Sequence, residues 1–386
     1  MLDADLIAQF VTTIRRFVDE QLVPNEEIVA QTDAIPDHLL AAMSEMGLFG
    51  LSIPTEYGGL GLSAEEEMRV IFEVGRASPA FRSIFATNVG IGSQAIVIDG
   101  SDEQKQRYLP KLATGEMIGS FALTEPDVGS DAASVKTTAR LDGDFYVLNG
   151  TKRFITNAPE AGLFTVMART GTAEEGEAGV TAFLVEAGTP GLTVGKPDRK
   201  MGQRGAHTAD VIFQDCRVPV ANIIGGIPGR GFRTAMKVLD KGRLHIAAAC
   251  TGAAQRLLEE AVAYATERQQ FGKPISSFQL VQAMLADCRT EIFAARAMVE
   301  NAARRRDAGE VVTADAACCK YFASEMVGRV ADRAVQIHGG SGYMADFPVE
   351  RFYRDVRLFR IYEGTSQIQQ LVIARHLLRE AAVARR

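Results

Sequence analysis

Apolar residues in the first 118 positions recur with the spacing of α-helices. The pattern is clearest in DLIAQFVTTIRRFVDEQLVP, residues 5–24, and in PDHLLAAMSEMGLFGL, residues 36–51. Prolines at positions 24, 36 and 54 interrupt these runs, as expected of a residue that does not continue a helix. Residues 1–118 are therefore predicted to form an all-α domain.

Near Gly119 the pattern changes to short strand-like runs separated by turn residues. In RLDGDFYVLNGTKRFITN, residues 140–157, the dipeptides Asp142-Gly143 and Asn149-Gly150 are strong signals for tight hairpins. Further runs rich in β-branched and aromatic residues continue to about residue 220. Residues 119–230 are predicted to form a β-domain, either a small barrel or a sandwich.

From residue 231 the helical period returns in three long runs that end near residue 340. They are long enough for a four-helix bundle in residues 231–386, and Gly309 stands where a helix end is expected. The predicted fold class is therefore α+β multidomain. Its parts are an N-terminal helical domain, a middle β-barrel or sandwich domain and a C-terminal four-helix bundle.

Composition narrows the functional classes. The 386 residues are 47% apolar and 23% charged, as in ordinary globular proteins, and the net charge of −6 argues against nucleic-acid binding. The first residues lack signal-peptide features and no apolar run is long enough to span a bilayer, so we expect a cytoplasmic protein without membrane insertion. The five cysteines form no CxxC and the five histidines show no ligand spacing, which predicts no bound metal. Redox chemistry would then need an organic cofactor.

Two glycine-rich stretches match the dinucleotide-binding fingerprint but stand in the wrong context. GLGLSA, residues 59–64, follows a proline-broken loop, and GSGYMA, residues 340–345, follows a long helix. The fingerprint works only between a strand and a helix. We therefore expect loops in both places, and a scaffold other than a Rossmann fold for any nucleotide cofactor.

Three other segments each have two interpretations. FALTEPDVGSDAA, residues 121–133, can offer N–H groups and hydroxyls to a ring edge or a phosphate, or is a turn rich in Asp and Ser. In KRFITN, Phe154 is either a core residue or a stacking face. In ERQQFGKPISSFQ, residues 267–279, Arg268 either clamps a pyrophosphate or lies on the surface near a helix end. The residues alone leave these alternatives open.

The segment IYEGTSQIQQ, residues 361–370, contains a lone carboxylate, Glu363. In one interpretation Thr365 or Ser366 caps the last helix and Gln369 completes a capping box. In the other, Glu363 lies in an apolar setting where desolvation raises its pKa toward a value useful for a general base. Composition alone does not choose between them.

Five segments together resemble the acyl-CoA dehydrogenase family over essentially the whole chain. They are LTEPDVGSD, NGTKRFITN, ERQQFGKPISSFQ, QIHGGSGYMADFPVERFYRD and IYEGTSQIQ, and each is similar to a family signature. The resemblance implies the same α-β-α fold, noncovalently bound FAD and a homotetramer. It also implies an acyl-CoA substrate and an electron-transfer flavoprotein as the electron acceptor.

The resemblance further implies roles for particular residues. Glu363 would remove the α-proton of the thioester while the β-hydrogen leaves as hydride to flavin N5, giving a trans-2-enoyl-CoA. A few relatives place the base just before the arginine of LDKGR, but that position is Gly242 here. The residues expected around FAD within one subunit are Phe121, Leu123, Thr124, Ser130, Phe154, Thr156, Thr365 and Gln367. Those expected from a neighbouring subunit are Arg268, Phe271, Phe278, Gln279, Gln336, Gly339 and Gly340. Those expected to contact acyl-CoA are Ser130, Asp240, Arg243 and Gly364.

Two departures from the common family pattern concern the flavin and the substrate. Phe154 stands where many relatives have tryptophan, although phenylalanine still supplies an aromatic face. Arg82, in SPAFRSIFATN, resembles an arginine of glutaryl-CoA dehydrogenases that receives the distal carboxylate of the substrate. The simpler alternative is an ion pair between Arg82 and a local acid such as Glu73. The same fold could also act as an oxidase, a decarboxylating dehydrogenase, a lyase without net redox, or a non-catalytic acyl-CoA-binding scaffold.

Overall fold

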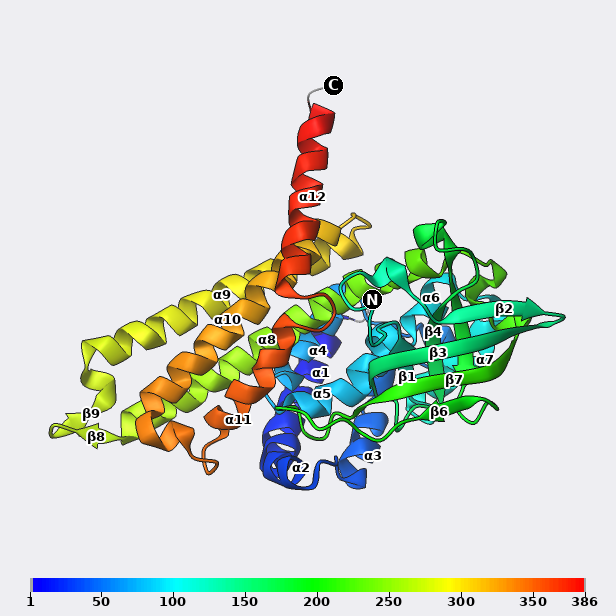
Figure 1. Cartoon of the computed structure of the whole chain (residues 1–386). Coiled ribbons are helices and arrows are strands. Elements are labelled where there is room, and N and C mark those ends of the chain that lie inside the picture. The colour runs from blue at the N-terminus through cyan, green and yellow to red at the C-terminus, as the bar shows by residue number, and fades with distance from the viewer. Residues whose placement is uncertain (1–2, 385–386) are drawn as a thin grey trace.

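The computed structural model describes residues 3–384, which form three consecutive parts (Figure 1). The first part is helical, as predicted. Its helices are α1 (Ala4–Phe17), α2 (Glu26–Thr32), α3 (Asp37–Glu45), α4 (Ala64–Val74), α5 (Pro79–Thr87), α6 (Gln94–Asp99) and α7 (Asp102–Thr114). Capping boxes begin two of them: Ser63 with Glu66 starts α4, and Ser101 with Gln104 starts α7.

The middle part is one curled seven-stranded sheet rather than a sandwich of two sheets. Its strands are β1 (Gly119–Ala122), β2 (Thr138–Asp142), β3 (Phe145–Thr156), β4 (Leu163–Arg169), β5 (Val180–Glu186), β6 (Leu192–Val194) and β7 (Thr208–Pro219), in the order β1-β4-β2-β3-β7-β6 with β5 on β4. Strand β4 pairs in parallel with β1, whereas β3 pairs antiparallel with β2 and β7. Phe164, Phe183 and Phe213 contribute to the sheet's own hydrophobic core.

One predicted hairpin turn is confirmed and the other is wrong. Gly143, with φ 59°, lies in the tight turn between β2 and β3. Asn149-Gly150 instead lies within β3, where the pairing with β7 shifts between Leu148 and Gly150. A Cβ atom at Gly150 would lie 2.6 Å from Thr137 Oγ1. The glycine therefore permits a close backbone approach at a β-bulge.

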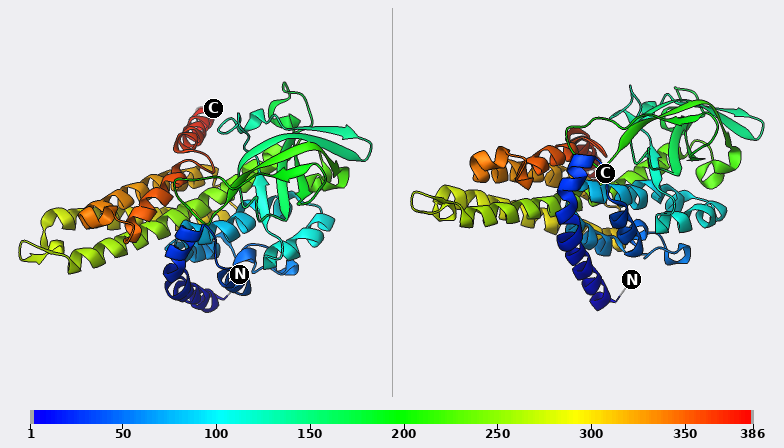
Figure 2. Two further views of the ribbon diagram at one scale, coloured as in Figure 1. Left: turned by 60° about the horizontal axis from the view of Figure 1, so that its bottom comes forward. Right: turned by 90° about the horizontal axis from the view of Figure 1, so that it is seen from below.

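The third part is the helical bundle. Helices α8 (Gly231–Glu267), α9 (Gln279–Asp307) and α10 (Thr313–His338) lie side by side, and α11 (Pro348–Asp355) packs on α10. The sequence did not predict the small hairpin that joins α8 to α9, which consists of β8 (Gln269–Gln270) and β9 (Lys273–Pro274). Among the N-terminal helices, α4, α5 and α6 pack against α8, and α5 also contacts β1. Figure 2 shows the N-terminal helices from two further sides.

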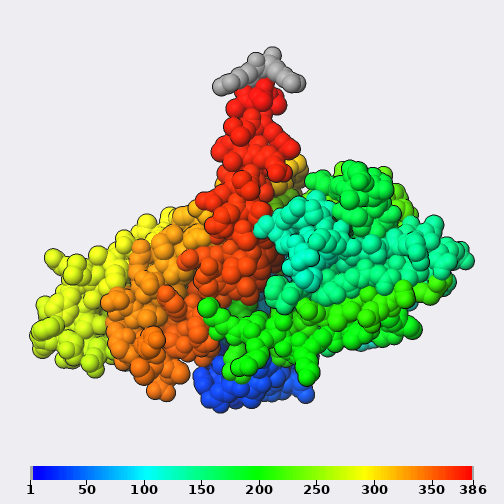
Figure 3. Space-filling view, viewed as in Figure 1, coloured from blue at the N-terminus to red at the C-terminus, as the bar shows by residue number. Residues whose placement is uncertain are grey.

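The last helix, α12 (Ser366–Ala384), contacts α10 through its first turns and then projects from the body of the molecule (Figure 3). Its projecting part exposes Leu377, Leu378 and Val383, all more than half accessible. None of the helices in the described part of the chain is both long and apolar enough to cross a membrane.

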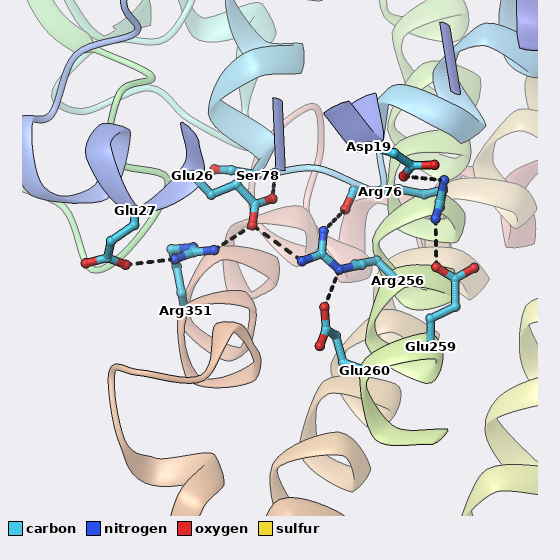
Figure 4. Close-up of polar contacts among 9 residues, drawn as sticks. All are labelled: Asp19, Glu26, Glu27, Arg76, Ser78, Arg256, Glu259, Glu260 and Arg351. Carbon is cyan, nitrogen blue, oxygen red and sulfur yellow. Dashed lines mark hydrogen bonds and ion pairs between the residues drawn. The ribbon is translucent and has the colours of Figure 1, made fainter. Parts of the chain in front are cut away.

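Buried ion pairs tie the N-terminal helices to the bundle (Figure 4). The buried carboxylate of Glu26, on α2, accepts hydrogen bonds from Ser78 N–H and from Arg351 Nη2, both at 2.7 Å. Arg256 of α8 lies 3.7 Å from the same carboxylate. Glu27 also approaches Arg351, at 3.4 Å, but its side chain is largely exposed. Glu26 therefore holds α2 against both α8 and α11.

Candidate active site

The turn before α12 presents Glu363 in an unusual backbone conformation. Glu363 and Gly364 have φ angles of 52° and 88°, in the left-handed region. The buried Lys320 of α10 donates from Nζ to the carbonyl oxygen of Gly364 at 2.7 Å. Gln369 donates from Nε2 to the carbonyl oxygens of Gly364 and Glu363, at 3.0 and 3.2 Å. These bonds hold a conformation that a non-glycine residue seldom adopts unaided.

The predicted helix cap is present beside the acid. Thr365 Oγ1 accepts a hydrogen bond from the Ile368 N–H at 3.2 Å, as an N-cap residue does. The predicted capping box is wrong, because the amide of Gln369 binds the two turn carbonyls instead. Capping and an acidic function are therefore compatible in this segment.

The carboxyl group of Glu363 has the environment of a proton acceptor. The residue is partly buried, and its Oε2 atom is enclosed without a hydrogen-bond partner in the described structure. Burial raises the pKa of Glu363 above the ordinary glutamate value, and the nearby cations Arg82, Lys320 and Arg243 oppose that rise. A carboxylate with a raised pKa and no competing donor is suited to take a proton from a bound molecule.

Gly242 of α8 makes room for this carboxylate. A Cβ atom at position 242 would lie 2.1 Å from Glu363 Oε2, well inside the closest approach found in folded proteins. Position 242 therefore faces Glu363 directly, and its lack of a side chain is required by the acid opposite.

Glu363 borders a cavity of about 380 Å³ between the sheet, α5, α8 and the start of α12. The predicted site residues that line this cavity are Arg82, Phe121, Leu123, Thr124, Ser130, Phe154, Thr156, Arg243, Glu363 and Gly364. Asp240 is not among the residues that line this cavity, but it accepts a hydrogen bond at 2.6 Å from Nη1 of Arg243, which does line it. The structure thus gathers residues from the N-terminal, middle and C-terminal parts of the chain around one cavity.

The other predicted cofactor residues lie elsewhere in the chain described. Thr365 and Gln367 stand at the start of α12, next to Gly364. Arg268, Phe271, Phe278, Gln279, Gln336, Gly339 and Gly340 lie at the opposite end of the bundle from the α8–β5 contact, around the β8–β9 hairpin and the end of α10 (Figure 1). The Phe271 ring is 91% exposed and meets the edge of Phe278 at 5.8 Å between ring centres.

Phe154 is not a core residue. It has φ 58°, is 60% exposed, and borders the cavity, with the Arg153 guanidinium 5.2 Å from its ring centre. The interpretation of Phe154 as a core residue is therefore wrong. Its ring is available as a stacking face.

A buried ion pair that sequence reasoning missed shapes the neighbouring loop. Lys152 is fully buried and donates to the carbonyl oxygen of Leu123 at 3.1 Å and to Glu125 at 2.7 Å. Glu125 also accepts the backbone N–H groups of Lys136 and Thr137, at 2.7 and 2.9 Å. Burial lowers the pKa of Lys152 to about 8, against the attraction of Glu125. The only signal in the sequence is a lysine within a strand.

The proposed pair of Arg82 with Glu73 is wrong. Glu73 binds Arg15 at 3.1 Å and Arg76 at 3.7 Å, on the side of α4 that faces α1. Arg82, on α5, is buried and donates from Nη2 to His245 Nδ1 at 3.0 Å. Its Nε has no hydrogen-bond partner within the described residues. Sequence reasoning did not identify His245.

The N-terminal helices, the curled sheet and the bundle meet at this cavity, and the enclosed carboxyl group of Glu363 lies at its edge. Three family models, described as the acyl-CoA dehydrogenase N-terminal, middle and C-terminal domains, match residues 6–116, 120–216 and 229–378. The chain belongs to the acyl-CoA dehydrogenase family, and its relatives are flavin-dependent oxidoreductases.

Individual relatives cover nearly the whole chain. A probable acyl-CoA dehydrogenase, YngJ of Bacillus subtilis, is 46% identical over 366 residues, which are 95% of this chain and 96% of the relative. An acryloyl-CoA reductase (NADH) of Anaerotignum propionicum is 45% identical, covering 95% and 92%. The solved structure of a glutaryl-coenzyme A dehydrogenase with glutaryl-CoA matches with a TM-score of 0.93 at 36% identity, covering 98% and 96%.

Proposed function

We propose that this enzyme converts an acyl-CoA thioester to the trans-2-enoyl-CoA, with Glu363 as the base that removes the α-proton. The observation that carries the proposal is the enclosed Oε2 atom of Glu363 at the edge of the cavity, which has no hydrogen-bond partner among residues 3–384. The left-handed turn, braced by Lys320 and Gln369, aims that atom and limits its motion. Such fixed placement is a large part of what a catalytic base contributes.

The same turn supplies a donor for the thioester carbonyl oxygen. No hydrogen bond from the Glu363 backbone N–H is made within the described residues. An N–H in a turn that does not reorganise can stabilise negative charge on the carbonyl oxygen as the α-proton leaves. Asp240 and Arg243 are assigned to CoA, together with Ser130 and Gly364.

The cofactor proposed for the cavity is FAD. The exposed ring of Phe154 offers a stacking face, the hydroxyls of Thr124, Ser130 and Thr156 offer hydrogen bonds, and the loop held by Lys152 keeps Leu123 in place. Bound FAD supplies the acceptor for the hydride that leaves the β-carbon. We assign to the same group Phe121, Thr365 and Gln367.

The distal residues around the β8–β9 hairpin are assigned to the FAD of a neighbouring subunit. The exposure of Phe271 at 91% and of Leu280 at 82% supports this, because apolar side chains so open are commonly covered by a partner. A homotetramer is the proposed assembly, and electron-transfer flavoprotein is the proposed electron acceptor.

A second candidate substrate is an acyl-CoA with a carboxylate at its far end. The observation that favours it is Arg82, a buried guanidinium on the cavity wall whose hydrogen-bond partner is a histidine rather than an acid. A buried cation of this kind is costly unless an anion joins it. The glutaryl-CoA complex of the similar solved structure agrees with this candidate.

The test is anaerobic titration of the purified yellow protein with acyl-CoAs, following the bleaching of flavin absorbance. Saturated acyl-CoAs should bleach the flavin and yield the 2-enoyl product. Glu363→Gln should keep its FAD content and its affinity for acyl-CoA but lose bleaching by a factor of about 10³ or more, because the amide takes no proton. Unchanged bleaching in this variant refutes the role of Glu363, and bleaching only by 2-hydroxyacyl or unrelated thioesters refutes the reaction class.

A further inference from the structure

His245 lies at the centre of a buried network of polar side chains, and it is not among the residues proposed to bind FAD or acyl-CoA or to act as the base. It is fully buried on α8, and its Nδ1 lies 3.0 Å from Arg82 Nη2 of α5. Its Nε2 lies 3.3 Å from Glu67 Oε1 of α4. Glu67 is itself fully buried and binds Lys241 at 3.1 Å and the Ser52 hydroxyl at 3.0 Å. This network of hydrogen bonds thus connects the carboxylate of Glu67 in the protein interior to Arg82 at the wall of the cavity.

These contacts determine the protonation of His245. A guanidinium only donates, so Nδ1 must carry a lone pair toward Arg82. The ring proton is therefore on Nε2 and is donated to Glu67. Burial, together with the neighbouring Arg82 and Lys241, lowers the pKa of His245 to about 4, against the attraction of Glu67. His245 is accordingly neutral, in one tautomer, throughout the physiological range.

The bond to His245 fixes how Arg82 faces the cavity. Because one Nη atom of Arg82 is held by His245, the orientation of the planar guanidinium is fixed and its remaining N–H donors are left for another partner. Nε of Arg82 has no hydrogen-bond partner within the described residues. Glu363 lines the same cavity and attracts the guanidinium, since Arg82 is the strongest of the cations that lower the pKa of that carboxyl. Without His245 the guanidinium would be drawn toward the base and away from an acyl chain.

We propose that His245, held by Glu67 as the Nε2–H tautomer, is a positioning residue that aims Arg82 at a carboxylate on the far end of the acyl chain and keeps it from pairing with Glu363. This inference rests on the proposed function, in its form with a dicarboxylic acyl-CoA, and deepens it, since it names the residue that secures that preference. His245 touches neither substrate nor the reacting atoms, and it acts through Arg82 alone.

The experiment compares two probes, glutaryl-CoA and butyryl-CoA, in anaerobic bleaching by the FAD-loaded enzyme. The variants are His245→Leu, His245→Gln, Arg82→Met and the double variant His245→Leu with Arg82→Met. His245→Leu removes both hydrogen bonds at similar volume, whereas glutamine can still accept from Arg82 through its oxygen and donate to Glu67 through its nitrogen. FAD absorbance and thermal midpoint report on folding, and His245→Asn replaces His245→Leu if the latter does not accumulate as yellow protein.

We expect the native enzyme to be bleached at lower concentrations of glutaryl-CoA than of butyryl-CoA. In His245→Leu the ratio of glutaryl-CoA to butyryl-CoA efficiency should fall by about tenfold or more, mainly through the half-saturating concentration. His245→Gln should restore much of that ratio. In the Arg82→Met background, His245→Leu should change the ratio no further, because the two residues act as one unit.

Three results overturn the inference. They are equal losses on both probes in His245→Leu, losses that add to those of Arg82→Met, and a native enzyme bleached by butyryl-CoA but not by glutaryl-CoA. The last of these leaves the proposed function standing. Failure of both probes and of other acyl-CoAs to bleach the native enzyme rejects the proposed function itself.

Discussion

A methyl group at position 242 is a sharp test of where the base lies. In Gly242→Ala the new Cβ atom would lie 2.1 Å from Glu363 Oε2 and 3.4 Å from the side chain of Ile91. The contact with Ile91 is an ordinary one, so the whole strain falls on the carboxylate. Alanine in a helix interior is favoured over glycine by roughly 1 kcal/mol, so α8 and the fold should not lose stability. The substitution therefore displaces the proposed base without altering its chemistry.

The size of the effect follows from the displacement. Non-bonded approaches below 3.0 Å are essentially absent for real Cβ atoms, so Oε2 must move by about 1 Å. A misplacement of that order in a reacting group costs on the order of 10²-fold in rate. Rapid anaerobic mixing with saturating acyl-CoA measures this rate, and FAD content and thermal midpoint report on the fold.

Gly90→Ala is the matched control, because a Cβ atom there meets nothing within 4 Å. The control should bleach like the native enzyme. A bleaching rate for Gly242→Ala within about threefold of the native rate, or under about 0.7 kcal/mol in barrier, would refute the placement of Glu363 opposite Gly242.

Three further predictions concern charged side chains. Lys320→Met should move the acid limb of the pH profile of the bleaching rate to higher pH, because Lys320 lowers the pKa of Glu363 and the base is active only above that pKa. Lys320→Arg should move this limb less. An acid limb that stays in place in both variants would show that Lys320 does not influence the pKa of the base. Glu26→Ala should cost about 3–5 kcal/mol in guanidinium chloride unfolding, since it removes the buried carboxylate that Arg351 and Arg256 share and leaves them only the less buried Glu27 and Glu260. Glu27→Ala removes the exposed partner of the same Arg351 and should cost under about 1 kcal/mol, so equal costs would contradict the reasoning. Lys152→Met should weaken FAD retention in dialysis, because Leu123 and Glu125 lose the ammonium that fixes their loop; full retention would show that the loop holds its shape without it.

The order of helical, sheet and helical parts could be predicted because it depends on local periodicity. The spacing of apolar residues in α9 and α10 reflects one buried face each, which is visible within a single segment, whereas α8 is buried on all sides from Lys241 to Ala254. The turn predicted at Asn149-Gly150 was wrong for the opposite reason. This dipeptide favours a turn locally, but pairing with β7, some sixty residues away in sequence, holds it in a strand.

The candidate base could be singled out from the sequence, but its surroundings could not. Lys320 lies in CCKYF on α10 and His245 in RLHIA on α8, where each looks like an ordinary member of a helix face. Their roles arise only where α4, α5 and the turn before α12 converge on them. The same holds for Arg82: Glu73 is near in sequence, but the geometry of α4 turns it toward Arg15 and Arg76 instead. Burial against distant segments is the information that local patterns lack.

Arg82 couples the choice of substrate to the strength of the base. Burial raises the pKa of Glu363, and Arg82 is the largest opponent of that rise. A substrate carboxylate bound to Arg82 would neutralise the guanidinium, and the acyl chain would exclude water, so both effects raise the pKa further and strengthen the base. With saturating acyl-CoA, the acid limb of the bleaching-rate profile should therefore lie at higher pH for glutaryl-CoA than for butyryl-CoA. The two limbs should coincide in Arg82→Met, because no guanidinium remains to be neutralised. Coincident limbs already in the native enzyme would show that no bound carboxylate changes the field that Arg82 exerts on Glu363.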